Sequence, residues 1–316
     1  MSPEFALIEQ YFTRAPRHAA LGVGDDCALW SPAAGFELAL STDTLVSGTH
    51  FFPDADPHGL GHKALAVNLS DLAAMGAIPR AALLALTLPR VEPAWLEAFA
   101  AGFWALAEAF DVDLVGGDTT RGPLSITLTV LGEVEQGRAL RRDGAKAGDD
   151  LWVSGDLGGA ALALRLVQGL CADPVADVEA LKVRLNRPQP RVALGRALLP
   201  IAHAMIDVSD GLVADVGHLC ERSGLGAEIE WSRVPMPDGL RDVQESLRLA
   251  CVLAGGDDYE LAFAAPAAQR SAVEALGGVT RIGSMVAGVE GVRVLDASGS
   301  PIRVERPGFD HFGHAS

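Results

Sequence analysis

Apolar and polar residues follow two different periods along this chain. In "LSITLTVLGEV" (124–134), apolar side chains occupy alternate positions, which is the clearest signal for a half-buried β-strand. In "PAWLEAFAAGFWALAEAF" (93–110), apolar residues recur with the helical spacing of three and four, which predicts an amphipathic helix. Segments of the two kinds alternate in both halves of the chain, so the pattern predicts an α/β or α+β fold.

Read in order, the first half is expected to form helices at 3–13, 59–75 and 93–110, and strands at 27–31, 36–42, 81–88, 112–116 and 124–134. The polar, glycine-containing stretch "RRDGAKAGDD" (141–150) marks the expected boundary between a domain 1–145 and a domain 146–316. In the second half we expect helices at 158–170, 177–185, 192–203, 211–223, 238–249 and 267–276, and strands at 151–154, 205–208, 227–231, 259–265, 279–283 and 288–295.

Length and composition agree with two ordinary domains. The chain has 316 residues, of which 49% are apolar, enough for substantial cores. No apolar run approaches the roughly 20 residues that span a membrane, and "MSPEFALIEQYF" at the N-terminus lacks the features of a signal peptide. The four cysteines lie far apart, at 27, 171, 220 and 251, which suits a reducing compartment. We therefore expect a cytoplasmic protein without membrane contact.

The net charge of −16 is concentrated in short acidic turns. These are "GVGDDC" (22–27), "LSTDT" (40–44), "NLSDLAAMG" (68–76), "LVGGDTTRGPL" (114–124), "IDVSDG" (206–211) and "GGDDYE" (255–260). With Asp215 they hold eleven carboxylates, so the rest of the chain carries only −5. Such a charge would repel a nucleic-acid backbone and attract divalent cations.

Familiar phosphate-binding and nucleophilic motifs are missing. The sequence has no P-loop, no kinase H-R-D or D-F-G set, no G-x-S-x-G elbow, and only three lysines. What recurs instead is a carboxylate beside hydroxyls, as at 41–43, 118–120 and 207–210. These are hard oxygen ligands of the kind that Mg²⁺ prefers, and Mg²⁺ characteristically joins one or two protein carboxylates to substrate phosphates. The pattern favours metal-assisted phosphoryl transfer.

Helix capping is the competing interpretation of each turn taken alone. Ser209 or Asp210 before "GLVADVGHL", and Asp71 inside "NLSDLAAMG", could be simple N-caps. The doubled acids at 25–26 and 257–258 are different, because they follow glycines and precede expected strands, where local capping explains nothing. We therefore expect metal binding somewhere among the acidic turns, while the roles of Asp25, Asp257 and Asp258 stay open.

Seven stretches together resemble the thiamine-monophosphate kinases. They are "GVGDDCAL", "LSTDTLVSGTHF", "KALAVNLSDLAAMGA", "LVGGDTTRGPLSITL", "IDVSDGLVAD", "GGDDYEL" and "GFDHF", in order from residue 22 to 312. The resemblance implies the two-domain α/β fold of the aminoimidazole-ribonucleotide-synthetase-like superfamily, with the N-terminal sheets of two subunits joined in a barrel and therefore a homodimer. It also implies direct in-line transfer of phosphate from ATP to thiamine monophosphate with several Mg²⁺ ions, in thiamine diphosphate biosynthesis.

The resemblance also assigns site residues. It implies that 1–145 binds ATP and Mg²⁺ and dimerises, and that 146–316 completes the active site. The implied metal ligands are Asp26, Ser41, Thr42, Asp43, Asp71, Asp118, Asp207 and Asp210, of which Asp43, Asp118 and Asp210 are the implied catalytic residues. The implied ATP contacts are Gly117, Asp118, Arg142 and Ser209, and the implied thiamine-phosphate contacts are His50, Glu260 and Phe309.

Each assignment has a physical reason and a rival. Arg142 can meet phosphate oxygens with two donors, or it can be a solvated charge between domains. His50 could reach the substrate phosphate, or be an ordinary loop histidine. Glu260 could pair with the cationic thiazolium, and Phe309 could stack on an aromatic cation. The aromatic residue that the family places beside adenine is not clear here, because Phe99, Phe103 and Trp104 are equally suited to the core.

Two other functions are weighed. Another enzyme of the same superfamily is less favoured, because Cys27 follows the acidic pair, unlike in selenophosphate synthetases, and because "FGHAS" offers no terminal cysteine for a hydrogenase-maturation role. A calcium-binding module is also less favoured, because no D-x-[DN]-x-[DN]-G loop occurs.

Overall fold

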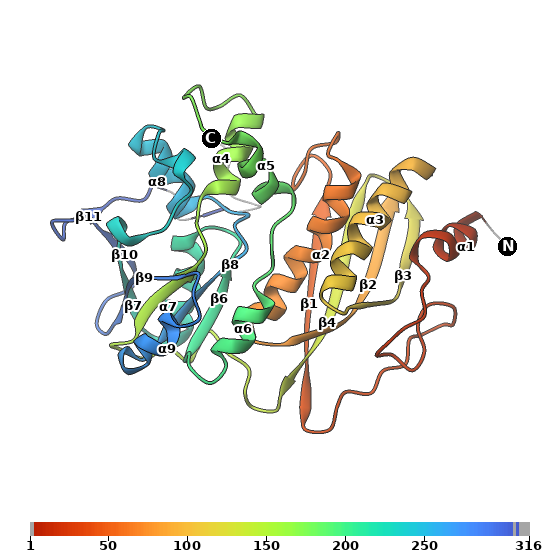
Figure 1. Ribbon diagram of the computed structural model, residues 1–316, viewed down its shortest axis with the longest axis horizontal. Helices are drawn as coiled ribbons and strands as arrows, with labels where there is room; N and C mark the ends of the chain where they lie inside the picture. The colour runs from red at the N-terminus through yellow and green to blue at the C-terminus, as the bar shows by residue number, and fades with distance from the viewer. Residues whose placement is uncertain (1–2, 306–307, 310–316) are drawn as a thin grey trace. The chain divides into compact units, whose positions relative to one another are not determined.

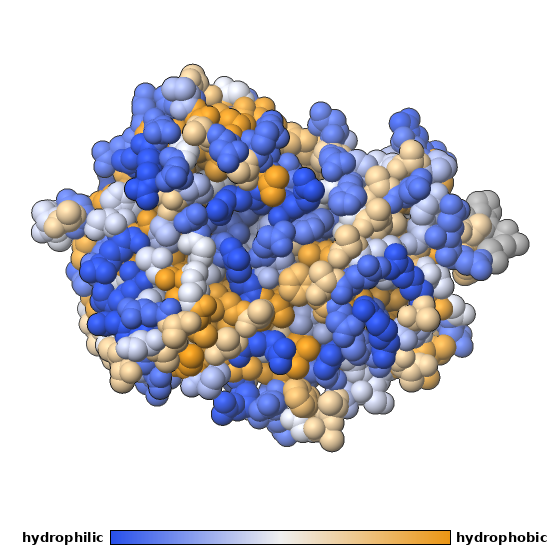
Figure 2. Space-filling model, in the orientation of Figure 1, coloured by the Kyte–Doolittle hydropathy of each residue, from blue (hydrophilic) through white to orange (hydrophobic). Residues whose placement is uncertain are grey.

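The computed structural model describes residues 3–305 and 308–309. These form two compact units (Figure 1): within the described residues the first comprises 3–72 and 77–138, and the second 73–76, 139–305 and 308–309. Among the described residues, no helix is long and apolar enough to cross a membrane. On the face shown in Figure 2, polar side chains interrupt the apolar ones throughout.

The first unit is a four-stranded sheet with two long helices on one face. Its elements are α1 (Pro3–Leu7), a π-helical turn (Ile8–Phe12), β1 (Phe36–Val46), α2 (Pro57–Ala74), β2 (Ile78–Leu88), α3 (Pro93–Ala109), β3 (Asp113–Arg121) and β4 (Ser125–Glu135). The strand order is β1-β4-β2-β3, and only β2 and β3 run parallel. Helices α2 and α3 lie side by side across the sheet (Figure 1) and approach so closely at Gly61 and Gly102 that a side chain at either would collide with the other helix.

The two faces of this sheet differ sharply within the unit. On the face that the helices cover, Leu84 of β2 and Leu128 of β4 are paired and buried. On the opposite face, Leu38, Leu40 and Leu83 are 39%, 62% and 37% exposed. The alternation that predicted a strand at 124–134 is confirmed by β4, in which exposed and buried positions alternate. We call the exposed side the open face.

Two expected turns are strands instead. The expectation that the strand at 112–116 ends at two glycines is wrong, because β3 continues through them and pairs with β2 as far as Arg121. Gly117 has φ 147°, and a Cβ there would lie 1.8 Å from the Leu84 carbonyl oxygen, so glycine permits close pairing of the strands. The strand expected at 36–42 extends to Val46, which places residues 41–43 inside β1.

The N-terminal segment also departs from expectation. The helix expected at 3–13 is α1 followed by the π-helical turn. No strand forms at 27–31; a single bridge joins Leu21 to Leu29, and the N–H of Ala20 donates to the Leu29 carbonyl at 2.8 Å. Residues 22–27 therefore form a loop that is closed at its base.

The second unit is a seven-stranded mixed sheet, ordered β11-β10-β7-β9-β5-β8-β6. Its strands are β5 (Asp150–Ser154), β6 (Ala204–Val208), β7 (Gly226–Glu230), β8 (Glu260–Ala265), β9 (Val279–Val286), β10 (Gly291–Leu295) and β11 (Pro301–Ile302). Its helices are α4 (Gly159–Val167), α5 (Val178–Asn186), α6 (Val192–Leu198), α7 (Leu212–Ser223), α8 (Glu245–Ala254) and α9 (Arg270–Glu274), with short 3₁₀ turns at Trp231–Arg233, Asp238–Leu240 and Ala267–Gln269.

Helix ends were the weakest expectations in this unit. The helix expected at 238–249 is a 3₁₀ turn followed by α8 from Glu245, and the helix expected at 192–203 ends at Leu198. The helix expected at 267–276 is likewise a 3₁₀ turn followed by α9. Apolar residues of β5, β6 and β8 pack with those of α4, α7 and α8 in one core. The residues that carry the acidic motifs lie at the ends of these core elements.

Candidate functional site

In the first unit, hydrogen bonds join the β1 motif to the α2 motif. The hydroxyl of Ser41 donates to Oδ2 of Asp71 at 2.5 Å, and the N–H of Asp43 donates to Oδ1 of Asn68 at 3.1 Å. Asn68 is 1% exposed and its amide also donates to the Ala64 carbonyl at 3.0 Å. Asn68 was not among the predicted site residues, although a buried amide in the apolar run "ALAVNLSDL" was the available signal.

Asp43 and Asp118 lie on opposite faces of the sheet. Asp43 pairs across β4 with Leu128, whose side chain is buried beneath the helices. Asp118 pairs with Ala85, which pairs in turn with Thr127 on the open face. Paired residues on adjacent strands project to the same side, and three strand spacings of about 4.8 Å separate β1 from β3. The two carboxylates of one chain are therefore not brought together on this sheet.

Three further predicted residues lie around β1. Thr42 is on the open face, where its hydroxyl contacts that of Thr129 at 2.8 Å. Asp26 lies in the exposed 22–27 loop, where its N–H donates to the Asp25 carboxylate at 2.8 Å. His50 follows β1, and its Nδ1 accepts the N–H of Val46 at 3.0 Å. Because Nδ1 is the acceptor, the proton of the neutral ring is on Nε2.

In the second unit, the turn 209–211 is held by a buried carboxylate. The N–H groups of Ser209, Asp210 and Gly211 donate to Oδ2 of Asp215 at 3.0, 3.1 and 3.0 Å. Asp215 is 3% exposed, and burial raises its pKa to about 6, against the opposing effect of these hydrogen bonds. Asp207 precedes the turn at the end of β6 and is 4% exposed. The predicted site residues Ser209 and Asp210 are thus held by Asp215, which was not among the predicted site residues.

The same turn gathers two other motifs. The N–H of Asp257 donates to the Ser209 carbonyl at 2.9 Å, and the N–H of Phe309 donates to the Asp210 carbonyl at 3.0 Å. Asp257 has φ 69°, which lets "GGDDYE" bend around the turn. Segments that are about 50 residues apart in sequence therefore form one assembly. Of the "GFDHF" motif, residues 310–312 lie outside the described residues.

Capping explains one of the doubled acids, contrary to the expectation from sequence. Asp258 accepts the N–H of Gly158 at 2.7 Å, at the start of α4. Burial raises the pKa of Asp258 well above its usual value. The helix that it caps lies 100 residues earlier in the chain, so no local pattern could show the contact.

Glu260 is engaged by two residues that the sequence did not indicate. Both carboxylate oxygens accept from the Arg191 guanidinium, at 2.6 and 2.5 Å, and Oε2 also accepts from the Ser154 hydroxyl at 2.5 Å. Glu260 is 3% exposed, and its hydrogen bond raises the pKa of Arg191. A Cβ at Gly155 would lie 2.1 Å from this carboxylate. The predicted contact with a cationic ring remains a prediction.

Arg142 is exposed, and its backbone carbonyl accepts the Ser223 hydroxyl at 2.7 Å. Its neighbour Arg141 pairs with Asp143 at 2.5 Å. The aromatic residues Phe99 and Phe103 are 0% exposed and belong to the core of the first unit. They therefore offer no accessible ring to an adenine base.

The donor set suits Mg²⁺, although no complete cage is formed. Among the described residues, no three histidine, cysteine or acidic side chains gather into a metal-binding group. The donors present are carboxylate and hydroxyl oxygens, as in the Ser41–Asp71 pair. Mg²⁺ needs only one or two protein carboxylates when phosphate oxygens supply the rest. Thiolate ligation is disfavoured at Cys220 and Cys251, because burial raises the pKa of each to about 11.

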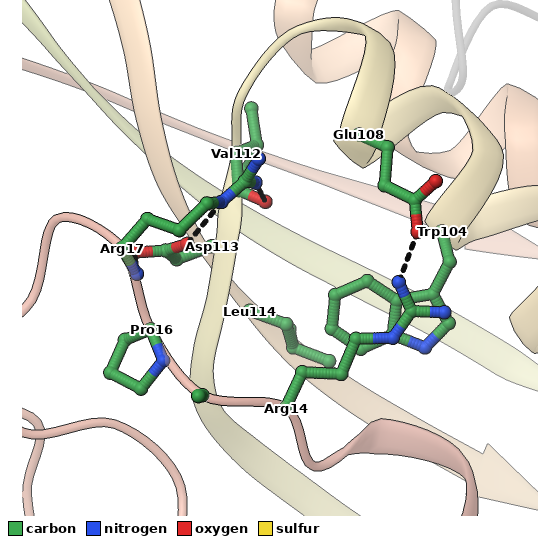
Figure 3. A pocket seen from close by; sticks show the side chains of 9 residues that line it. Arg14, Pro16, Arg17, Trp104, Glu108, Val112, Asp113 and Leu114 are labelled. Atoms are coloured by element: carbon green, nitrogen blue, oxygen red, sulfur yellow. Dashed lines mark hydrogen bonds and ion pairs between the residues drawn. The ribbon is translucent and has the colours of Figure 1, made fainter.

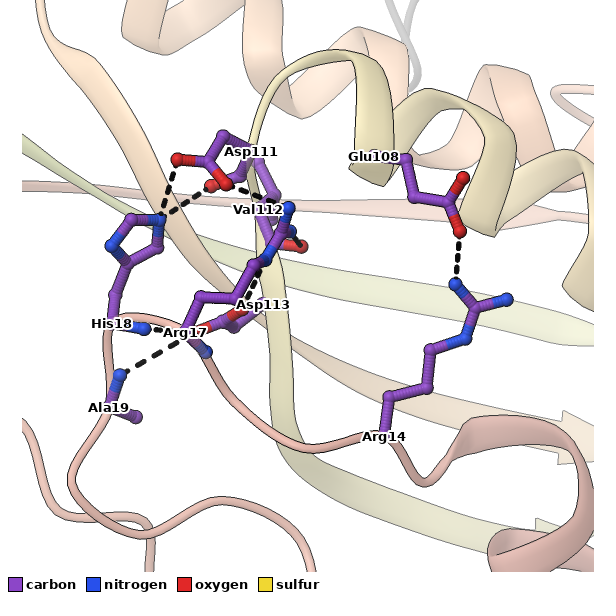
Figure 4. A network of polar contacts seen from close by, with 8 residues as sticks. All are labelled: Arg14, Arg17, His18, Ala19, Glu108, Asp111, Val112 and Asp113. Carbon is purple, nitrogen blue, oxygen red and sulfur yellow. Dashed lines mark hydrogen bonds and ion pairs between the residues drawn. The ribbon is translucent and has the colours of Figure 1, made fainter.

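A cavity of about 230 Å³ in the first unit lies elsewhere (Figure 3). It is lined by Arg14, Ala15, Pro16, Arg17, Trp104, Glu108, Val112, Asp113 and Leu114, none of which is a predicted site residue. Arg14 lies 4.0 Å over the Trp104 ring and pairs with Glu108. Asp113 accepts the N–H groups of Arg17 and His18 at 2.7 and 2.6 Å (Figure 4). The Arg14–Glu108 pair fastens the N-terminal segment to α3, and the hydrogen bonds to Asp113 fasten it to β3. We therefore assign the cavity a structural role.

Comparison with known proteins places the chain in a family. The AIR synthase related protein N-terminal domain matches residues 24–134, and the corresponding C-terminal domain matches residues 146–296. The thiamine-monophosphate kinase of Salmonella typhimurium is 48% identical over 320 residues, covering 98% of each chain.

Two solved structures show the same fold. The crystal structure of thiamine-monophosphate kinase from Stenotrophomonas maltophilia has a TM-score of 0.84 at 48% identity, covering 90% of this chain and 93% of that one. A structure described as AaThiL complexed with AMPPCP and TMP has a TM-score of 0.79 at 33% identity, covering 98% of this chain and 96% of that one. The chain therefore belongs to the AIR synthase-related family, and within it to the thiamine-monophosphate kinases.

Proposed function

We propose that this enzyme transfers the γ-phosphate of ATP to thiamine monophosphate, giving ADP and thiamine diphosphate, as a step of thiamine diphosphate biosynthesis. The observation that carries the proposal is the 48% identity to a thiamine-monophosphate kinase over 98% of both chains. The assembly of the 209–211 turn, the "GGDDYE" segment and Phe309 supports it, because three stretches of the family resemblance meet there. The relative with AMPPCP and TMP bound supports the choice of both ligands.

The proposed metal ligands are Asp26, Ser41, Thr42, Asp43, Asp71, Asp118, Asp207 and Asp210. When bound, Mg²⁺ would neutralise phosphate charge and allow an acidic site to accept a triphosphate. The Ser41–Asp71 hydrogen bond supports one half of this set, because it places a hydroxyl and a carboxylate oxygen 2.5 Å apart. Several ions are proposed, because the ligands occupy more than one place in the fold.

The remaining roles concern nucleotide and substrate. Gly117, Asp118, Arg142 and Ser209 are the proposed ATP contacts. The close pairing of β3 with β2 accounts for the glycine at 117, so the ATP contact proposed for Gly117 rests on the family resemblance. His50, Glu260 and Phe309 are the proposed contacts to thiamine monophosphate; Phe309 is 54% exposed, so its ring is accessible for stacking.

The attacking group needs little activation from the protein. A phosphate monoester has a second pKa of about 6, so its oxygen is already anionic near neutral pH. In-line attack on the γ-phosphorus then depends on positioning and on charge neutralisation. The roles proposed for Asp43, Asp118 and Asp210 are of this second kind, and no phosphoenzyme is required.

The open face supports a homodimer with a shared barrel. Within the first unit it exposes Leu38, Leu40 and Leu83 on one side of an otherwise well-packed sheet. Face-to-face packing of two such sheets would bury these side chains. Asp118 lies on the same face, so in that assembly it would be at the subunit interface. The domain roles proposed are nucleotide binding and dimerisation for 1–145 and completion of the site by 146–316.

A coupled assay of ADP release tests the function. Thiamine monophosphate should stimulate release with Mg²⁺ and ATP, whereas unphosphorylated thiamine should not, because it lacks the phosphate nucleophile. Equal stimulation by thiamine would contradict the proposed acceptor. Calorimetry separates the calcium-binding alternative, which requires tight Ca²⁺ binding without nucleotide.

A further inference from the structure

The 209–211 turn presents all of its N–H groups to one carboxylate oxygen. Oδ2 of Asp215 accepts from Ser209, Asp210 and Gly211 within 3.0–3.1 Å, although Asp215 lies on the following helix α7. A charged acceptor makes hydrogen bonds about twice as strong as a neutral one. Three consecutive backbone groups are thus fixed by a single side chain.

The carbonyl groups of the turn are also engaged. Ser209 and Asp210 accept the N–H groups of Asp257 and Phe309 at 2.9 and 3.0 Å. Gly211 has φ 132°, and a Cβ there would lie 2.9 Å from the backbone of α8. The N–H groups and the carbonyl groups of the turn are therefore both hydrogen-bonded, which restricts its backbone conformation. Asp215 is the side chain that accepts the N–H groups.

Ordinary helix capping does not require this arrangement. Helix capping satisfies the N–H groups of the first helical turn, whereas Asp215 accepts the N–H groups of the three residues that precede α7. The Asp215 carboxylate is instead 3% exposed and directs one oxygen at all three of these N–H groups. Such a buried contact is expected where the geometry of the turn is needed for function.

We propose that Asp215 is a positioning residue for phosphoryl transfer, which holds the Ser209 hydroxyl and the Asp210 carboxylate where magnesium and nucleotide meet them. The proposal rests on the proposed function, because it needs Asp210 to bind metal and Ser209 to bind ATP. Asp215 acts through the backbone of the turn and does not itself touch the reacting atoms.

Two variants and one control test the proposal. Asp215→Leu removes the acceptor, and Asp215→Asn keeps one neutral acceptor oxygen. Asp177→Ala is the control, because Asp177 caps α5 through the Ala180 N–H at 3.3 Å and contacts no part of the turn. Hydrogen exchange of the 209–211 amides is measured in metal-free protein, and the half-saturating Mg²⁺ concentration is measured with ATP and thiamine monophosphate.

We expect Asp215→Leu to speed amide exchange and to raise the half-saturating Mg²⁺ concentration at least tenfold, with Asp215→Asn between it and wild type and the control unchanged. If the leucine variant does not fold, the asparagine variant decides, with an expected rise of at least threefold. A folded variant within twofold of wild type in both measurements overturns the proposal. If wild-type protein shows no ADP release with thiamine monophosphate, the proposed function fails as well, so the two failures are distinguishable.

Discussion

Replacing Arg191 with alanine should destabilise the second unit strongly, because the buried carboxylate of Glu260 would lose the positive charge that it is paired with. Arg191 bonds both oxygens of Glu260 at 2.5–2.6 Å, and the side chain of Glu260 is 4% exposed. Removing one partner of a buried pair costs about 3–5 kcal/mol. Since the arginine side chain is 37% exposed, water can reach the vacated space, and we expect about 2–3 kcal/mol. For a domain of this size that lowers Tm by roughly 4–12 °C.

Urea unfolding and calorimetry, followed for each transition separately, measure the loss. Glu260→Gln with Arg191→Met is the matched double variant, because it removes the pair without leaving a buried charge. A double-mutant cycle should then show a coupling of about 2 kcal/mol between the two positions. A folded Arg191→Ala protein within about 0.5 kcal/mol of wild type would refute the reasoning, since the usual effect of a neutral surface change is that small.

Three other predictions test separate parts of the structure. Asp43→Asn and Asp118→Asn should each lower turnover at saturating Mg²⁺ by at least about 100-fold, and near wild-type rates in both would exclude the metal ligation proposed for them. The hydrogen bonds and Arg17 contact of Asp113 lower its pKa against desolvation, so the stability it contributes is present above the unfolded pKa of about 3.9 and is lost as pH falls through the folded value. Asp113→Asn should therefore cost about 2 kcal/mol at pH 7 and progressively less as the pH falls below the unfolded pKa, as measured by urea unfolding, and a pH-independent difference would contradict this. If the proposed homodimer forms through the open face, Leu40→Asp should convert it to a monomer in sedimentation velocity, whereas Leu170→Asp, similarly exposed in the second unit, should not.

Periodicity predicted most elements, because packing and pattern agree where one face of an element is buried. The strand at β4 and the helix at α3 were found within one or two residues. The pattern gave a wrong prediction at the two glycines 116–117, which usually indicate a turn. Here the strand continues, and Gly117 allows β3 to pair closely with β2. Contacts between strands decide such cases, and these are not visible in one segment.

In the candidate site, too, the local motifs could be predicted from the sequence, whereas the contacts between distant residues could not. Motifs such as "IDVSDG" and "GGDDYE" were recognisable one by one, and the structure joins them through backbone hydrogen bonds. The carboxylate–arginine pair at Glu260 and the α4 cap at Asp258 could not be predicted, because their partners lie 69 and 100 residues away. The sheet pairing that separates Asp43 from Asp118 also depends on strand order, which one acidic turn cannot reveal.

Calorimetry of nucleotide binding tests the central claim most directly, namely that the acidic turns accept a triphosphate only with magnesium. AMPPCP is titrated into the protein in the presence of Mg²⁺ and again with the metal removed by a chelator. We predict binding with Mg²⁺ and at least a hundredfold loss of affinity without it, because the unscreened carboxylates repel the phosphates. Equal affinity under both conditions would contradict the account.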